Sequence, residues 1–134
     1  MKMIYVAHPY GGKKENEVAA DVITRMLQKR FPEQCFVSPI HGIREIDIYD
    51  ENTTEEEYLA GMRRCITLLS RCDAIVLTGD WKKSRGCCLE FFIAQCKGIP
   101  VLEMEKLVAM DKVAFHLFLG ENVAFADMLH SCKK

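Results

Sequence analysis

The sequence lacks both a long hydrophobic run and an excess of charge of either sign. The apolar stretch within its first ten residues is too short for the core of a signal peptide, and nothing approaches the roughly 20 apolar residues of a membrane-spanning helix. Eighteen Lys and Arg residues are balanced by 19 Asp and Glu, which gives a formal net charge of −1. This balance leaves no electrostatic footprint for nucleic acid or for an anionic membrane surface. We therefore expect a cytoplasmic protein whose ligands are small molecules.

The sequence also lacks cysteine spacing of the zinc or thioredoxin type. Its seven cysteines are an odd number, and no two of them form a CxxC pair. We expect reduced, mostly buried thiols, and neither a metal site nor a cofactor.

The composition is that of one folded domain. With 134 residues the chain has room for one compact unit, spanning residues 1–134. Hydrophobic residues make up 49% and charged residues 28%, both near globular averages, which excludes a disordered or low-complexity chain.

Short β-favouring runs alternate with amphipathic segments along the chain. Strands are predicted at residues 3–7, 35–38, 74–78 and 100–103. Helices are predicted at residues 13–31, 54–71 and 86–97 from apolar spacing and capping residues. Residues 40–52 show no clear period and are expected to form a loop. The segments 107–118 and 123–129 each fit a helix, although either could contain a fifth strand.

This alternation predicts a three-layer, doubly wound α/β fold of flavodoxin-like or Rossmann-like type, built on a parallel sheet. In the strand order 2-1-3-4, with a fifth strand at the edge if one exists, the winding reverses between the strands that end at Ala7 and Thr78. Ligands of such sheets bind outside the carboxyl ends of the strands at that point. Residues 8–13 and 79–86 therefore face the expected binding crevice.

Both of these loops contain small residues and lead into a predicted helix. Gly11 and Gly12 allow backbone N–H groups to approach an anion. Ser84 and Gly86 offer a hydroxyl and further helix-end N–H groups. A phosphate group fits this chemistry. Either loop alone is explained equally well as the capped start of a helix. For the two loops together, a phosphate site and simple helix capping both remain open.

A helical wheel of residues 86–97 places Glu90 at the border of an apolar arc. The arc contains Leu89, Phe92, Ile93 and Cys96, whereas Cys87 and Phe91 lie away from it, on a candidate dimer surface. Gly86, one turn earlier, leaves a space beside the Glu90 carboxylate. A carboxylate beside a phosphate-binding loop can attack the anomeric carbon of a bound nucleotide and form a glycosyl-enzyme ester. The alternative is that the Glu90 side chain points to solvent and has no catalytic role.

Three further residues near the crevice have two interpretations each. Asp80 and Trp81 follow the third strand and are placed to orient a sugar and to stack on a base. A loop Trp equally serves as a lid or a subunit contact. His41 follows the second strand and lines the crevice unless its side chain is solvated.

Three segments of the chain form a pattern that extends beyond any one of these residues. They are Ile4-Tyr5-x-Ala7-x-Pro9-x-Gly11-Gly12, Asp73-Ala-Ile-Val-Leu and Ser84-x-Gly86-x-x-x-Glu90-x-x-x-Ala94-x-x-x-Gly98. Over roughly residues 3–102, this pattern resembles the nucleoside 2-deoxyribosyltransferase superfamily. The likeness is strongest to its small branches, the deoxynucleoside 5′-monophosphate N-glycosidases and the uncharacterised phage and bacterial deoxyribosyltransferase-like proteins.

The resemblance implies a role for each matching residue. Glu90 would be the nucleophile, and the Tyr5 hydroxyl would hold its carboxylate. Gly11, Gly12, Ser84 and Gly86 would contact a 5′-phosphate. A Ser at position 84, where nucleoside-specific members tend to carry Asp, is similar to the branch that accepts monophosphates. The resemblance also implies a homodimer or higher homo-oligomer, often with a neighbouring subunit completing each site.

Two positions depart from the family pattern. Cys65 stands eight residues before Asp73, where active members usually carry Asp. His8 stands where a small residue is common, and it either narrows the floor of the pocket or offers its imidazole to the substrate. The first hypothesis is an enzyme that cleaves or transfers the N-glycosidic bond of a nucleoside or deoxynucleoside 5′-monophosphate through Glu90. The second is a non-catalytic module that senses a nucleotide in the same crevice. A purely structural or partner-binding domain is the third.

Overall fold

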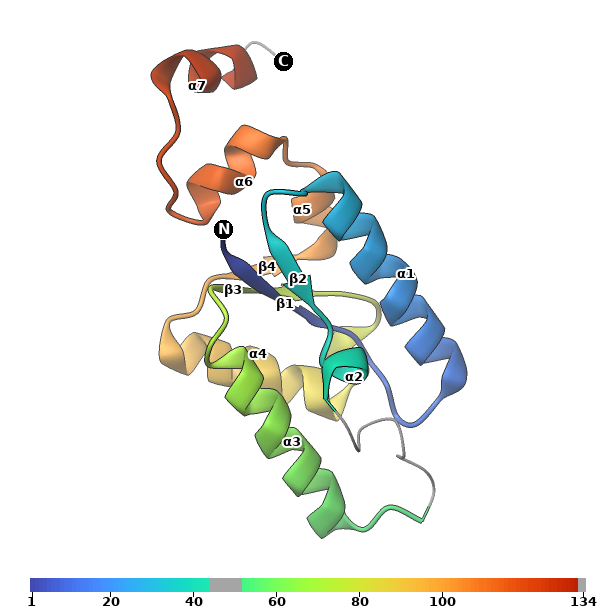
Figure 1. Ribbon diagram of the computed structural model, residues 1–134. Coiled ribbons are helices and arrows are strands. Elements are labelled where there is room, and N and C mark those ends of the chain that lie inside the picture. Colours follow the sequence, from blue (N-terminus) through green and yellow to red (C-terminus); the bar gives the residue numbers. More distant parts are fainter. Residues whose placement is uncertain (44–51, 133–134) are drawn as a thin grey trace.

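The computed structural model describes residues 1–43 and 52–132 of the chain (Figure 1). Its strands are β1 (Met3–Ala7), β2 (Cys35–Val37), β3 (Ala74–Leu77) and β4 (Val101–Glu103). Its helices are α1 (Lys14–Arg30), α2 (Pro39–Gly42), α3 (Glu55–Leu69), α4 (Arg85–Lys97), α5 (Met104–Val108), α6 (Lys112–Phe118) and α7 (Phe125–Cys132). A 3₁₀ turn, η2, spans Trp81–Lys83.

The four strands form one parallel sheet in the order β2-β1-β3-β4. This order confirms the predicted doubly wound α/β fold, with the reversal of winding between β1 and β3. Both C-terminal segments that left room for a fifth strand are helical, and the Asp111 side chain caps α6 by accepting a hydrogen bond from the Ala114 amide at 2.8 Å. The described residues therefore contain no fifth strand.

Local capping signals fix the starts of the two helices that bound the crevice. At α3, Thr54 Oγ1 accepts a hydrogen bond from the Glu57 amide at 3.1 Å. At α4, Ser84 Oγ accepts one from the Cys87 amide at 3.2 Å. Both predicted helix starts are confirmed to within a residue. The predicted loop at residues 40–52 is wrong at its start, because Pro39 begins the helical turn α2, and residues 44–51 lie outside the described part of the chain.

Helices cover both faces of the sheet (Figure 1). Residues of α1, α5 and α6 pack against one face, and residues of α3 and α4 pack against the other. Because side chains alternate along a strand, β1 contributes Ile4 and Val6 to the first face and Tyr5 and Ala7 to the second. Within the described residues, no helix combines the length and the apolar character that a membrane crossing requires.

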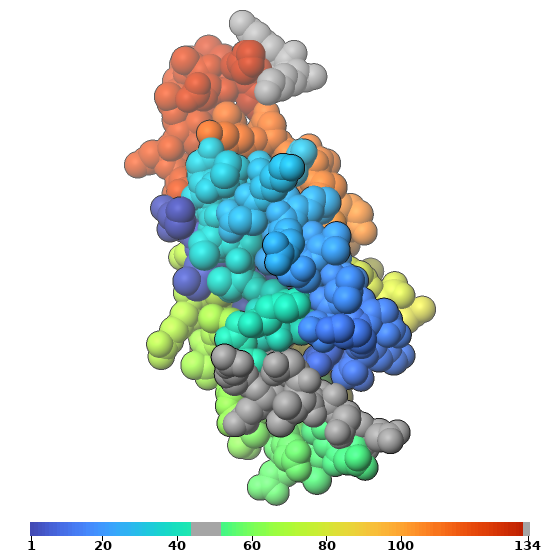
Figure 2. Space-filling model, turned by 45° about the vertical axis from the view of Figure 1, so that its right-hand side comes forward, coloured from blue at the N-terminus to red at the C-terminus, as the bar shows by residue number. Residues whose placement is uncertain are grey.

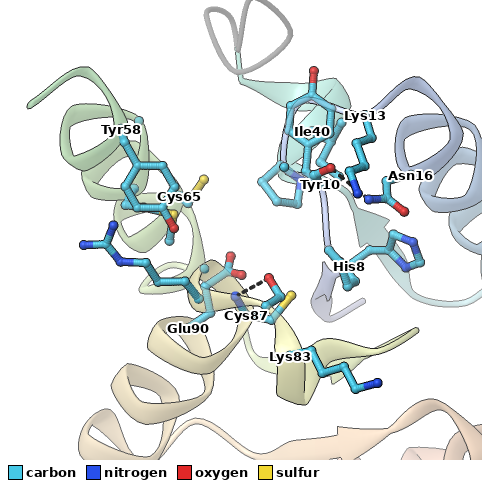
Figure 3. A pocket seen from close by; sticks show the side chains of 18 residues that line it. His8, Tyr10, Lys13, Asn16, Ile40, Tyr58, Cys65, Lys83, Cys87 and Glu90 are labelled. Carbon is cyan, nitrogen blue, oxygen red and sulfur yellow. Dashed lines mark hydrogen bonds between the residues drawn. The ribbon is translucent and has the colours of Figure 1, made fainter. Parts of the chain in front are cut away.

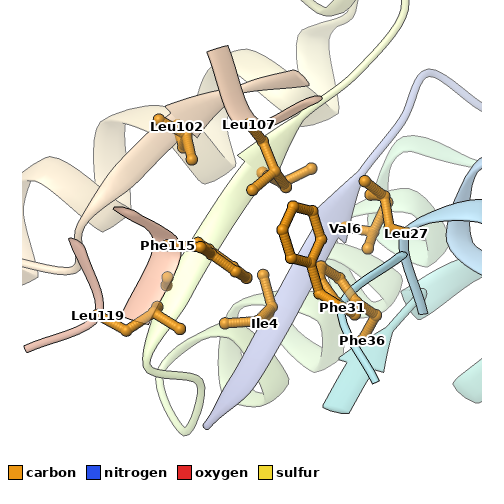
Figure 4. Packing of buried hydrophobic residues seen from close by; sticks show 11 residues of the cluster. Ile4, Val6, Leu27, Phe31, Phe36, Leu102, Leu107, Phe115 and Leu119 are labelled. Atoms are coloured by element: carbon orange, nitrogen blue, oxygen red, sulfur yellow. The ribbon is translucent and has the colours of Figure 1, made fainter. Parts of the chain in front are cut away.

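The buried cluster on the first face consists of hydrophobic residues alone (Figure 4). Phe31, Phe36 and Phe115 lie at its centre, with ring centroids 4.7 to 6.4 Å apart. Such aromatic contacts add to the free energy gained from removing the rings from water. This face holds α5 and α6 against the sheet.

The helix α4 turns a different side to the core than its spacing predicts. Its buried residues are Cys87, Glu90 and Ala94, and its exposed residues include Leu89, Phe92 and Cys96. Phe91, expected on an outer surface, is partly buried, and its ring centroid lies 5.1 Å from that of Trp81. Apolar side chains surround this helix, so their spacing alone leaves its rotation undetermined.

The exposure of the cysteines also differs from the expectation. All seven are free thiols, and Cys65, Cys72 and Cys87 are buried. The exposed cysteines are Cys88, Cys96 and Cys132. The prediction of mostly buried thiols was therefore wrong for α4 and for the C-terminal helix.

Candidate functional site

A cavity of about 440 Å³ opens at the carboxyl edge of the sheet, where the crevice was predicted (Figure 3). One wall comes from the loop after β1, the start of α1, and α2, with His8, Pro9, Tyr10, Gly11, Lys13, Asn16, Pro39 and Ile40. The opposite wall comes from α3, with Tyr58, Gly61, Met62 and Cys65. The floor comes from the start of α4, with Lys83, Ser84, Arg85, Gly86, Cys87 and Glu90.

Glu90 lies in the second turn of α4 and directs its carboxylate into the cavity (Figure 3). Only 5% of the residue is exposed, and its Oε2 atom accepts a hydrogen bond from the Tyr5 hydroxyl. Burial raises the pKa of Glu90 to about 7, and the hydrogen bond from Tyr5 opposes this rise. The carboxyl group therefore gains or loses its proton near neutral pH.

Tyr5 supports this carboxylate from the central strand β1. The residue is fully buried, and it points to the side of the sheet that α3 and α4 cover. Burial, and then the negative charge of Glu90, raise the pKa of Tyr5 well above its ordinary value. The hydroxyl keeps its proton at all ordinary pH values and serves as a permanent hydrogen-bond donor.

Cys65 reaches the same pair from α3. Its thiol makes a hydrogen-bonding contact with Tyr5, and burial, followed by the charge of Glu90, raises the pKa of Cys65 to about 12. Burial likewise raises the pKa of Cys87, on the floor, to about 12. Both thiols stay neutral at pH 7, so they are neither thiolate nucleophiles nor rivals to the charge on Glu90.

The space at Gly86, which was predicted to lie beside Glu90, is small and is bounded by α3. A Cβ atom on Gly86 would lie 3.4 Å from Tyr58 Oη and 3.4 Å from Met62 Sδ. A methyl group would therefore touch the α3 wall. The Tyr58 side chain points into the cavity from that wall (Figure 3).

The glycine loop after β1 has a left-handed backbone. Gly11 has a φ of 60° and Gly12 a φ of 72°, a region that residues with a side chain seldom adopt. The helix α1 begins after this loop, and Lys13 at its N-cap position makes no side-chain cap. Gly11 and Lys13 line the cavity, whereas Gly12 does not. The positive end of the α1 dipole and the Lys13 charge therefore lie at this wall.

The start of α4 gives the floor a second positive helix end. The Ser84 hydroxyl accepts the Cys87 amide hydrogen and retains its own proton for a ligand. Arg85 is held at the rim by two contacts with the Glu55 carboxylate, at 3.0 and 2.5 Å, and its guanidinium lies 4.8 Å from the centre of the Tyr58 ring. The floor thus combines a hydroxyl, helix-end amides and a fixed cation.

His8 lies on the α1 side of the cavity (Figure 3). Its Nδ1 atom is 2.8 Å from Thr78 Oγ1, and the Thr78 hydroxyl donates to the Ala7 carbonyl at 2.8 Å. Because that hydroxyl has one hydrogen, His8 Nδ1 must donate, which leaves Nε2 as an acceptor. Burial lowers the pKa of His8, so the ring is neutral. Gly79, with a φ of 61°, leaves room for the ring, since a Cβ atom there would lie 2.8 Å from His8 Cε1.

Besides Gly12 and the buried Tyr5, three further candidate residues do not line the cavity. Asp80 is exposed, and the η2 turn carries Trp81 to the outer side of α4, where it packs on Phe91 and Lys82 lies 5.7 Å from its ring centre. His41 is exposed, and its Nδ1 atom lies 3.1 Å from Ser38 Oγ at the start of α2. Within the described residues, no cluster of His, Cys, Asp and Glu is arranged to hold a metal ion.

Sequence reasoning missed most of the cavity walls. Tyr58 and Met62 share a helix face with Cys65, at spacings of four and three residues, but this face was not predicted to line the crevice. That shared face was the signal that all three look toward one place. Tyr10 and Asn16 gave no comparable signal, because the Asn16 side chain bonds the Tyr10 carbonyl only after the loop has folded back, at 2.9 Å.

The chain is similar to one protein family and to solved structures. It matches the DUF4406 family, described as a domain of unknown function, over residues 2–103. The structure of a 2-deoxyribosyltransferase from Bacillus psychrosaccharolyticus superposes with a TM-score of 0.56 and 18% identity, over 75% of this chain and 70% of that chain. A conserved protein from Enterococcus faecalis V583 superposes with a TM-score of 0.59 and 16% identity, over 99% of this chain and 98% of that chain. No curated protein sequence matches the chain.

At identities of 18% and 16%, the two solved structures establish a shared fold only. They confirm the α/β arrangement that the alternation of strands and helices in the sequence predicted. The family match covers the whole sheet and every residue that lines the cavity. The chain therefore belongs to the DUF4406 family.

Proposed function

We propose that the protein cleaves or transfers the N-glycosidic bond of a nucleoside 5′-monophosphate, with Glu90 as the nucleophile. The observation that carries this proposal is the Glu90 carboxylate, nearly buried, bonded to Tyr5 and directed into a cavity with a positive helix end at one wall and another at its floor. The fold that the chain shares with a 2-deoxyribosyltransferase supports the same reaction class.

In the first step, an oxygen of Glu90 attacks C1′ of the sugar from the side opposite the base. Tyr5 engages Oε2, so Oε1 is the oxygen left for attack. The C1′–N bond breaks, its electron pair goes to the base nitrogen, and the base takes up a proton from water. An ester then links Glu90 to C1′, and the positive charge that develops on the sugar ring is balanced by the carboxylate.

In the second step, water or the nitrogen of another base attacks C1′ and displaces Glu90. The attacking group loses one proton to solvent, and the carboxylate is regenerated. Two displacements at C1′ retain its configuration, as in retaining glycosidases. Water gives a sugar phosphate, whereas a second base gives a new nucleotide.

In this proposal the 5′-phosphate binds between the start of α1 and the start of α4. Amides near Gly11 and Gly86, the Ser84 hydroxyl and the Lys13 charge can each contact an anion, and all four residues line the cavity. The neutral Ser84 hydroxyl can donate a hydrogen bond to a phosphate, whereas a carboxylate at this position would repel it. We leave the base and the 2′-substituent of the sugar open and include both in the test below.

A second candidate, binding without turnover, is favoured by one observation. Cys65 occupies the wall beside Glu90 as a neutral thiol whose pKa is about 12, and such a group is a poor proton donor to a departing base. A protein of this kind would bind nucleotides in the same cavity and report their presence.

The test incubates the protein with ribo- and deoxyribonucleoside 5′-monophosphates and with the matching nucleosides, and measures free base by chromatography and ligand binding by thermal shift. We expect base release from at least one monophosphate, and a loss of about a thousandfold or more in Glu90→Gln, which keeps the size of the side chain. Thermal stabilisation by the ligand should persist in that variant. Undiminished release by Glu90→Gln would refute the nucleophile, and stabilisation of the wild type without base release would establish the sensing alternative.

A further inference from the structure

The outer face of α1 carries apolar side chains that no part of the described chain covers. Val18 is 51% exposed, Val22 59% and Met26 41%. The core-facing residues of α1 are instead Ala20, Ile23 and Leu27. In Figure 2, α1 runs along the surface of the molecule, in blue. An amphipathic helix normally exposes a polar stripe on this side, so the apolar one needs an explanation.

The stripe has a symmetric arrangement of charge. At about 100° per residue, Val18, Val22 and Met26 fall within an arc of about 80°. Glu15 and Lys29 lie on the same arc, each seven residues from Val22, and both are exposed. The stripe, Glu15-Val18-Val22-Met26-Lys29, is therefore acidic at one end, basic at the other and apolar between.

Such a stripe is complementary to itself when two copies run antiparallel. A two-fold axis at Val22 places Val22 against Val22, Val18 against Met26, and Glu15 against Lys29 on both sides of the axis. The flanking charges do not compete for this contact, because Asp21 is already paired with Arg25 at 2.9 Å on its own helix. We propose that two copies of the chain associate through this face of α1, with Val22 on the symmetry axis. The proposal does not depend on the chemistry of the cavity.

The association is expected to be reversible. The seam spans one helix face of about 20 Å, which is smaller than the surface that permanent dimers bury. The apolar centre supplies the affinity, and the paired ends fix the antiparallel direction.

Sedimentation equilibrium of the intact protein from low micromolar to submillimolar concentration measures the association. We expect dimers in the wild type and at least a tenfold weaker association in Val22→Glu. The control is Phe92→Glu on α4, because Phe92 has the same exposed fraction, 59%, on a different helix. It should leave the association unchanged. A wild type that stays monomeric, a Val22→Glu variant that still dimerises, or a Phe92→Glu variant that does not would each overturn the proposal.

The register is tested by charge exchange and by a cross-link. Glu15→Lys and Lys29→Glu should each weaken association about threefold or more, and the double variant should restore it, since both pairs are rebuilt in reverse. Val22→Cys, made with Cys88, Cys96 and Cys132 replaced by Ser, should oxidise to a dimer linked between the two new cysteines, identified by mass spectrometry. A double variant weaker than either single one, or a cross-link that does not form while dimers are present, would exclude this register. Circular dichroism of each variant confirms that the fold is retained.

Discussion

The two sides of strand β1 face surroundings of opposite polarity. On one face, Ile4 and Val6 of β1 join a cluster of hydrophobic residues in which Phe31 and Phe115 lie 4.7 Å apart. On the other, Tyr5 meets the buried Glu90 carboxylate, at the start of α4. A buried carboxylate costs stability, and proteins tolerate this cost where function requires the group. The difference teaches that one face is built to hold the fold together, whereas the other holds an ionisable group at a cavity.

The largest effect on the apolar face is expected from Phe115→Ala. Removing a buried aromatic ring from such a cluster costs about 3 to 5 kcal/mol of unfolding free energy. Activity per folded molecule should change little, because Phe115 is on the opposite side of the sheet from the cavity. Urea unfolding measures the loss of stability, and base release measured at urea concentrations below the unfolding transition measures the activity of the folded protein. A loss of activity as large as that of Glu90→Gln would show that the faces are not independent.

The buried carboxylate should make stability depend on pH. The pKa of Glu90 is about 7 in the folded protein against 4.5 for an unburied glutamate, so its stabilising contribution is complete below pH 4.5 and declines as pH rises to 7. Above pH 7 the decline amounts to about 3 kcal/mol, since one pKa unit is about 1.4 kcal/mol. Urea unfolding from pH 5 to 8 should show this decline in the wild type relative to Glu90→Gln. Parallel curves for the two proteins would place the carboxylate in a solvated environment.

A carboxylate placed at the helix start should weaken phosphate binding without weakening the helix. Asp caps helices as well as Ser, so Ser84→Asp keeps the fold while adding a negative charge to the floor. We expect about a tenfold to hundredfold loss of affinity for nucleoside monophosphates, and little loss for the nucleosides, by calorimetry. Ser84→Asn is the uncharged control. An equal loss for both ligand classes would mean that position 84 does not face the phosphate.

The smallest expected change comes from Tyr5→Phe. Its hydrogen bond lowers the pKa of Glu90, so removing it should move the midpoint of the pH–rate profile above 7. Activity requires the ionised carboxylate, and it should therefore fall about tenfold at pH 7 and recover in part at higher pH. A midpoint that stays in place would show that Tyr5 has a packing role only.

The sheet order and helix starts could be predicted because their signals are local. Thr54 and Ser84 cap the helices that follow them, and the β-favouring runs are short and well separated. Positions that directly follow strands, such as His8 and Gly11, also reached the cavity as expected. The roles assigned to these residues remain predictions.

What failed depended on contacts between distant parts of the chain. The rotation of α4 places Glu90 on Tyr5, a contact across 85 residues, whereas the wheel followed the apolar residues and turned Leu89 and Phe92 inward. In α1 the apolar residues occupy two sides of the helix, so their spacing alone does not say which side faces the core. Trp81 followed a strand as the cavity residues do, but the η2 turn carried it onto Phe91. The spacing of apolar residues predicts the strands and helices of this fold, but only packing determines how each helix is rotated about its axis.

The most direct test of the account is to trap the ester on Glu90. The protein is mixed with a cleavable nucleoside monophosphate, quenched in acid within milliseconds to seconds, digested and examined by mass spectrometry. We expect the mass of one sugar phosphate on the peptide that contains Glu90, and its transfer to an added free base when the quench is delayed. Base release with no added mass on Glu90, at a rate unchanged in Glu90→Gln, would contradict the account.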